Sequence, residues 1–257
     1  MIHPSGTKLV RKVPEITLIF WVAKVLTTAM GESTSDYIVF KINPYAAVIM
    51  GFAAFVIALI IQFKAKKYVP WIYWLTVTMV AIFGTMAADV LHIQLGVPYV
   101  VSTVFFACAL VVIFALWHRL EHTLSIHSIN NFRRETLYWA AVLATFALGT
   151  AAGDWTAVSL GLGYFTSGLV FVGIFAIPAL GYRLFGLNSV LAFWSAYIVT
   201  RPLGASFADW FGKPTAVGGR GLGDGIVALI LALLIVTCVA YMQLNRREEK
   251  RENALPR

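Results

Sequence analysis

The stretch WAAVLATFALGTAAGD, from Trp139 to Asp154, places a tryptophan, a glycine and an aspartate along one apolar segment. Nine residues separate the tryptophan from the glycine, and four separate the glycine from the aspartate. The same spacing recurs in Trp21–Asp36 (WVAKVLTTAMGESTSD), Trp74–Asp89 (WLTVTMVAIFGTMAAD) and Trp194–Asp209 (WSAYIVTRPLGASFAD). A recurring pattern of this kind indicates that the chain is built from four copies of one structural unit.

Each copy contains two apolar segments that can cross a membrane, since a spanning helix needs about 20 apolar residues. The predicted spans are 14–36, 44–63, 70–91, 98–117, 135–155, 163–182, 188–210 and 223–244. The predicted repeats are 9–64, 65–120, 127–185 and 186–246, within one transmembrane domain over 1–257. Two spans per copy make all four copies enter the membrane in the same sense. We therefore expect an all-α polytopic membrane protein with eight transmembrane helices from four parallel two-helix repeats.

The composition favours the same class of protein. Of the 257 residues, 60% are hydrophobic and 12% are charged, whereas soluble domains carry about 25% charged residues. The mean hydropathy is +0.80. The net charge of +8 comes from Lys and Arg residues that flank the apolar segments, so we expect membrane lipid as the partner and not nucleic acid.

The positive charges also predict the orientation. Fifteen of the 20 Lys and Arg residues fall on one side of the predicted spans, and this side includes both ends of the chain. Positive loops lie in the cytoplasm, so both termini are predicted to be cytoplasmic. Lys24 and Arg201 are exceptions, because each lies inside a predicted span.

The repeat glycines predict close helix packing. In each copy a small residue follows the glycine by four positions, on the same helix face, and such faces let membrane helices approach closely. The glycines are Gly31, Gly84, Gly149 and Gly204, followed by Ser35, Ala88, Gly153 and Ala208. We expect each repeat tryptophan to anchor its helix at the cytoplasmic membrane interface.

The aspartates carry the functional prediction. The chain has five, and all fall at repeat landmarks: Asp36, Asp89, Asp154 and Asp209 in the motif, and Asp224 at the start of the last span. Ionisable residues in membrane helices are costly, and they mark ion paths and proton relays. If the repeats surround an axis, the carboxylates converge and cannot all stay ionised. Either a cation neutralises them, or some hold protons; the alternative is four helix-end residues that bond neighbouring turns.

Oxygen-only ligands favour hard cations such as Mg²⁺, Ca²⁺ or Mn²⁺. The predicted metal ligands are Asp36, Asp89, Asp154 and Asp209, and Glu32 and Asp224 are further candidates for substrate or proton binding. Lys24 and Arg201 are candidate charge partners of these acids. Such pairing would lower the charge of the site and leaves an anionic or zwitterionic substrate open. We interpret the glycine-rich segment 218–223 as a flexible outer loop.

The four repeat motifs, with Val13–Thr17 (VPEIT) and Trp21–Leu26 (WVAKVL) around the start of the first copy, resemble a bacterial family. Its members are membrane-anchored proteins made of four copies of a repeat of unknown function. The resemblance covers nearly the whole chain and implies a multi-pass protein of the bacterial cytoplasmic (inner) membrane. It implies no activity.

We therefore expect a secondary transporter of a small cation, a divalent metal resembling Mn²⁺ or Mg²⁺, exported in exchange for protons. The alternatives are a pseudo-tetrameric cation channel, since a ring of carboxylates suits a cation pore, and a non-transporting scaffold or sensor. No catalytic or nucleotide-binding motif is present, so we expect neither enzyme activity nor a cofactor. The sequence leaves open whether the chain forms homo-oligomers.

Overall fold

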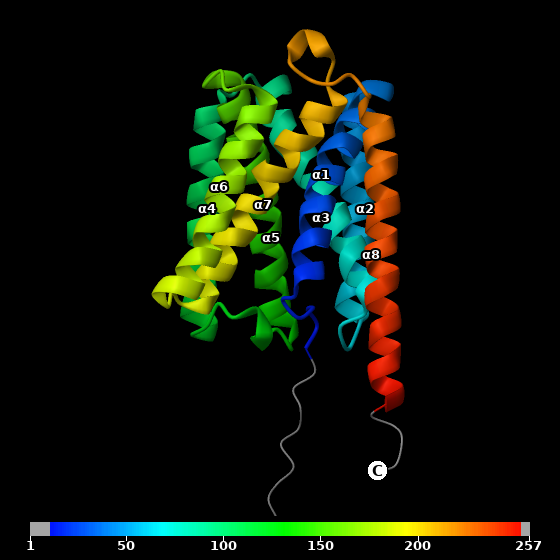
Figure 1. Ribbon diagram of the computed structural model, residues 1–257, viewed down its shortest axis with the longest axis vertical. Helices are drawn as coiled ribbons and strands as arrows, with labels where there is room; N and C mark the ends of the chain where they lie inside the picture. The colour runs from blue at the N-terminus through cyan, green and yellow to red at the C-terminus, as the bar shows by residue number, and fades with distance from the viewer. Residues whose placement is uncertain (1–10, 253–257) are drawn as a thin grey trace, which may run out of the picture.

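A computed structural model describes residues 11–252, with the side chains of 93–94 and 247–252 left aside. It contains eight long α-helices and no β-strand within this range. The helices are α1 (Leu18–Lys41), α2 (Pro44–Lys64), α3 (Pro70–Asp89), α4 (Tyr99–Glu121), α5 (Phe132–Asp154), α6 (Gly163–Phe185), α7 (Ser189–Gly212) and α8 (Asp224–Glu252). They stand roughly along one direction, and α1 begins and α8 ends at the same end of the bundle (Figure 1).

The first helix of each repeat belongs to an inner ring. α1 packs against α3, α3 against α5, α5 against α7, and α7 closes the ring on α1. The second helices lie outside the ring, and each packs mainly against the first helix of the next repeat: α2 on α3, α4 on α5, α6 on α7 and α8 on α1. The four repeats therefore form a closed circle rather than a row.

The repeat glycines make this ring close. A Cβ atom built on Gly31 would lie 2.5 Å from the Cβ of Ala81, and one on Gly84 would lie 2.7 Å from the Cβ of Phe146. The two remaining glycines lie equally close to the next helix. A Cβ atom built on Gly149 would lie 2.9 Å from the Cδ of Pro202, and one built on Gly204 would lie 2.9 Å from the nitrogen of Ala29. Only glycine fits at such distances.

Six helices are long and apolar enough to cross a membrane: Pro44–Lys64, Pro70–His92, Tyr99–Glu121, Phe132–Ser159, Gly163–Phe185 and Asp224–Arg246. In the outer helices α2, α4, α6 and α8, fewer than a quarter of these residues are buried inside the protein. Their apolar surface therefore faces outward, as in a membrane protein. The two helices outside this set, α1 and α7, carry buried charged residues that lower their hydropathy, among them Lys24, Glu32 and Arg201.

The repeat tryptophans do not form an interfacial belt, so that prediction is wrong for three of the four. Trp74, Trp139 and Trp194 are at most 4% exposed and pack in the core of the ring. Tyr73 and Tyr138 join them there, with their hydroxyl groups 2.5 Å apart. The rings meet edge to face, which is a favourable arrangement. The tryptophans thus fill the half of the ring nearest the ends of the chain, which we call the terminal half.

The helix ends differ from the predicted spans near the aspartates. α1 begins after the N-cap Thr17 and continues to Lys41, so Asp36 lies within the helix and not at its end. One π-helical turn, Val90–Gln94, follows Asp89, and another, Trp155–Ser159, follows Asp154. Single π-helical turns occur often at functional sites. The periodicity of the sequence carries no signal for them.

The segment after α7 is not the flexible loop that its glycines suggested. The N–H groups of Arg220, Leu222 and Gly223 donate to the carbonyl oxygens of Trp210, Phe211 and Gly212 at 2.6, 3.1 and 3.1 Å. These carbonyl groups would otherwise lack partners at the helix end. The segment 213–223 is therefore a cap on α7.

Candidate functional site

A cavity of about 290 Å³ lies in the other half of the ring, the acidic half, where α1 ends and α2 begins. All four motif aspartates line it, one from each repeat: Asp36, Asp89, Asp154 and Asp209. Glu32, Lys213, Tyr99 and Tyr164 line it as well. The closed ring brings the acids together because each occupies the same register on its inner helix.

Three of these acids come especially close. One carboxylate oxygen each from Glu32, Asp154 and Asp209 lie within 4.8 Å of one another. Glu32 and Asp209 are buried, at 4% exposure each. We call these three residues the acidic triad. They come from α1, α5 and α7, so the packing of the inner ring holds the triad together.

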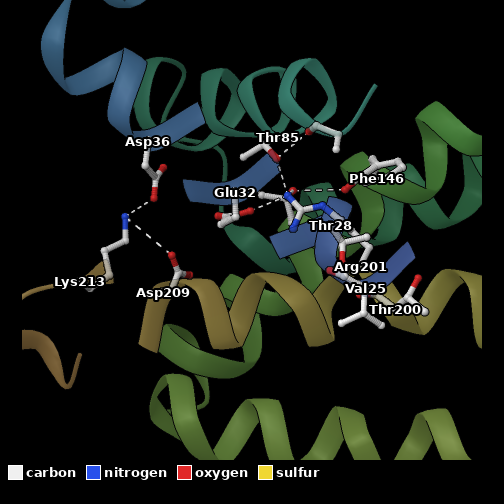
Figure 2. A network of polar contacts seen from close by, with 12 residues as sticks. Val25, Thr28, Glu32, Asp36, Thr85, Phe146, Thr200, Arg201, Asp209 and Lys213 are labelled. Carbon is white, nitrogen blue, oxygen red and sulfur yellow. Dashed lines mark hydrogen bonds and ion pairs between the residues drawn. The ribbon is translucent and has the colours of Figure 1, made fainter. Parts of the chain in front are cut away.

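Arg201 pairs with Glu32, one of the acids that line the cavity, and its side chain is fully buried. Its Nη2 donates to Glu32 Oε2 at 2.5 Å, to Thr150 Oγ1 at 2.6 Å and to Thr85 Oγ1 (Figure 2). The three acceptors occupy one repeat position, directly after Gly31, Gly84 and Gly149. One arginine thus connects the other three repeats across the axis of the ring.

A threonine fixes the backbone beside this arginine. The hydroxyl group of Thr28 donates to the carbonyl oxygen of Thr200 at 3.0 Å and to that of Val25 at 2.7 Å (Figure 2). Thr28 and Arg201 hold matching places in their repeats, each three residues before the motif glycine. The contact between α1 and α7 therefore positions Arg201 against Glu32.

Lys213 lies over the other side of the cavity, directly after the end of α7. Its ammonium group forms an ion pair with Asp36, and its Nζ is 3.8 Å from Asp209 Oδ1 (Figure 2). Burial lowers the pKa of Lys213, but the neighbouring carboxylates of Asp36 and Asp209 raise this pKa by more, and the net shift is upward. The neighbouring carboxylates therefore favour the protonated, cationic form of Lys213.

Two of the aspartates have no such partner. Among the described residues, no side chain donates a hydrogen bond to Asp89 or Asp154, and neither forms an ion pair. Of the described residues, five carboxylate groups and one cation, Lys213, line the cavity, and a second cation, Arg201, pairs with Glu32. Carboxylates that lie this close require protons or a bound cation.

Lys24 lies deeper than Arg201 and does not contact a carboxylate of the described chain. Its Nζ is 4.0 Å from the ring centroids of both Phe146 and Tyr197, and it has no hydrogen-bond partner there. Aromatic faces attract an ammonium group. Of the two candidate charge partners, the structure thus places Arg201 beside an acid and Lys24 between aromatic rings.

Asp224 is not among the residues that line the cavity. It begins α8, where its Oδ1 lies against Gly212. Three groups that do belong to the site gave no signal that singled them out: Lys213, Thr85 and Thr150. Lys213 follows Asp209 by four residues, a helical spacing that could have indicated the pair, but the predicted helix ended before it.

The chain matches the family described as Repeat of Unknown Function (DUF347) four times, over residues 19–68, 72–123, 137–185 and 192–248. Each match contains one inner and one outer helix. No curated protein and no solved structure matches the chain significantly.

Proposed function

The chain belongs to the family built from the Repeat of Unknown Function (DUF347), and from its cluster of carboxylates we propose that it is a secondary transporter of a small divalent cation. The cation resembles Mn²⁺ or Mg²⁺ and leaves the cell in exchange for protons. The protein crosses the bacterial cytoplasmic membrane eight times, with both termini in the cytoplasm.

The acidic triad carries the proposal. Three carboxylate oxygens within 4.8 Å of one another are the kind of oxygen site that hard divalent cations prefer. Asp89 lines the same cavity without a described partner, so it can complete the ligand set or hold a proton. Because close carboxylates cannot all stay ionised, cation release favours proton binding, which couples the two fluxes.

The placement of the buried charges supports eight spans. α1 and α7 have 24 residues each, about 36 Å at about 1.5 Å per residue, and a bilayer core is about 30 Å thick. Their polar side chains Lys24, Glu32 and Arg201 are at most 4% exposed, so these helices present no charge to lipid there. Intramembrane charges that face the interior of a bundle are tolerated.

The filled terminal half of the ring favours a carrier over a channel. Trp74, Trp139 and Tyr138 are buried in the terminal half, and Arg201 is fully buried, where it donates hydrogen bonds to residues of the other three repeats. A pore needs a continuous polar path, whereas a carrier exposes its site to one side at a time. The cavity is lined by residues from the end of α1 and the start of α2. These helix ends lie opposite the ends of the chain (Figure 1), which is the outer side if both termini are cytoplasmic.

A thermal-shift titration of the purified protein with Mn²⁺, Mg²⁺, Ca²⁺ and Zn²⁺ tests the metal site. A ligand that binds the folded state raises Tm, so we expect one of these ions to stabilise the wild type. The variants Asp154→Asn and Asp209→Asn should lose this shift.

Asp224→Asn is the matched control, because it removes an aspartate of the same end of the bundle that does not line the cavity. It should keep the full shift. A wild type that none of the four ions stabilises would end the metal-transport proposal.

A further inference from the structure

Only the last of the four repeats has a lysine four residues after its motif aspartate, and this residue is Lys213. It follows the motif aspartate of the last repeat by four residues, and the other three repeats have Phe40, Ile93 and Val158 at this place. The repeat motif therefore accounts for the four aspartates but not for Lys213.

The ammonium group of Lys213 contacts carboxylates that line the cavity. It pairs with Asp36, and it lies 3.8 Å from Asp209, a member of the acidic triad. The lysine side chain lines the cavity and is 20% exposed. One tethered positive charge thus contacts a ligand that a bound cation needs.

The backbone of Lys213 is fixed while its side chain can move. Its N–H group donates to the Asp209 carbonyl at 2.8 Å, and its own carbonyl accepts from the Gly221 N–H at 2.8 Å. The side chain beyond is a flexible four-carbon stem with a compact charge. The cap on α7 therefore keeps the ammonium group within reach of the site after it has left the carboxylates.

From this geometry we propose that Lys213 is a tethered competitor for the transported cation, which rests on the proposed function of the same site. The ammonium group takes the place of a substrate charge at Asp36 and Asp209, and it leaves when a divalent cation binds. A monovalent cation gains nothing in charge by replacing an ammonium group, whereas a divalent cation doubles the Coulomb attraction. Lys213 thus makes the site selective for divalent over monovalent cations.

Calorimetric titration of the purified full-length protein with the ion found by thermal shift tests this role. Lys213→Met removes the competing charge, and we expect the Kd to fall by about tenfold, since a close charge is lost from a partly buried site. Excess K⁺ should weaken binding of the divalent ion in Lys213→Met more than in the wild type. Lys213→Arg keeps the charge and should keep the weaker affinity and the resistance to K⁺.

Lys41→Met is the matched control, because Lys41 is an exposed lysine at the same end of the bundle that does not line the cavity. Its Kd should equal that of the wild type. If Lys213→Met is folded and binds the ion with equal or lower affinity, the competitor role is wrong and the metal site stands. If the wild type binds no divalent ion, the metal site fails, and this role with it.

Discussion

Acids at the two ends of the bundle have opposite surroundings. At the end where the chain begins and finishes, Glu135 accepts from Lys12 at 2.5 Å and from Gln62 at 2.8 Å. Glu121 at the same end pairs with both Arg133 and Arg134. In the cavity, Asp89 and Asp154 have no described partner at all. The first group of acids joins neighbouring helices, and the second has no partner among the described residues.

This difference shows which acids serve the fold. A buried carboxylate without a partner costs free energy, so a fold keeps one only where a proton or a cation compensates it. Both cations, Arg201 and Lys213, come from the last repeat and pair with acids of the first repeat, whereas the unpaired Asp89 and Asp154 come from the two middle repeats. The repeats are alike in backbone and differ in charge.

Removal of Arg201 should have the largest effect on stability. Arg201→Met leaves Glu32 buried without a cation, and breaking a buried pair in this way costs about 3–5 kcal/mol. Denaturation in detergent measures this loss. The double variant Arg201→Met/Glu32→Gln should recover most of it, because no unpaired charge remains. A single variant as stable as the wild type would show that the arginine does not hold the ring together.

Neutralising one acid at each end tests the comparison directly. Glu135→Gln should lower the free energy of unfolding by about 1.5–3 kcal/mol, as expected when a charged hydrogen bond is lost. Asp154→Asn, without added metal, should be as stable as the wild type or more stable, because it removes an uncompensated charge. Equal losses in the two variants would contradict the assignment of Asp154 to a ligand site.

A side chain at a repeat glycine should open the ring. Gly204→Val places a Cβ atom 2.9 Å from the Ala29 nitrogen, and we expect a loss of about 1–3 kcal/mol from overpacking. Gly173→Val on the outer helix α6 is the control, since nothing lies within 4 Å of its Cβ position. The denaturation midpoint of Gly204→Val, measured under the same conditions, should be lower than that of Gly173→Val. A Gly204→Val variant as stable as the wild type would refute close packing of α7 on α1.

The smallest expected effect lies in the aromatic half. Tyr73→Phe removes the 2.5 Å hydrogen bond to Tyr138 and should cost about 1 kcal/mol. The affinity for the divalent ion should not change, because neither tyrosine lines the cavity. A clear change in Kd, with stability preserved, would instead place the aromatic half on the transport path.

The architecture could be predicted because apolar segments of about 20 residues and a repeated glycine motif leave few alternatives. The meeting of the four aspartates also followed from the repeat, since equal spacing gives equal depth. The tryptophans were misplaced because an interfacial and a buried aromatic residue look alike in sequence. The contact of Arg201 with Thr85 and Thr150 could not be foreseen, because it depends on a side chain that crosses the axis of the ring.

Flux in proteoliposomes tests proton-coupled cation transport most directly. Vesicles with an acidic interior and a trapped metal-sensitive dye receive Mn²⁺ outside, and the quenching rate is followed with and without the pH gradient. We predict that the gradient accelerates Mn²⁺ entry, that Asp154→Asn abolishes it, and that Asp224→Asn retains it. A rate that is independent of the gradient, or equal in Asp154→Asn and the wild type, would contradict proton-coupled transport through the acidic triad.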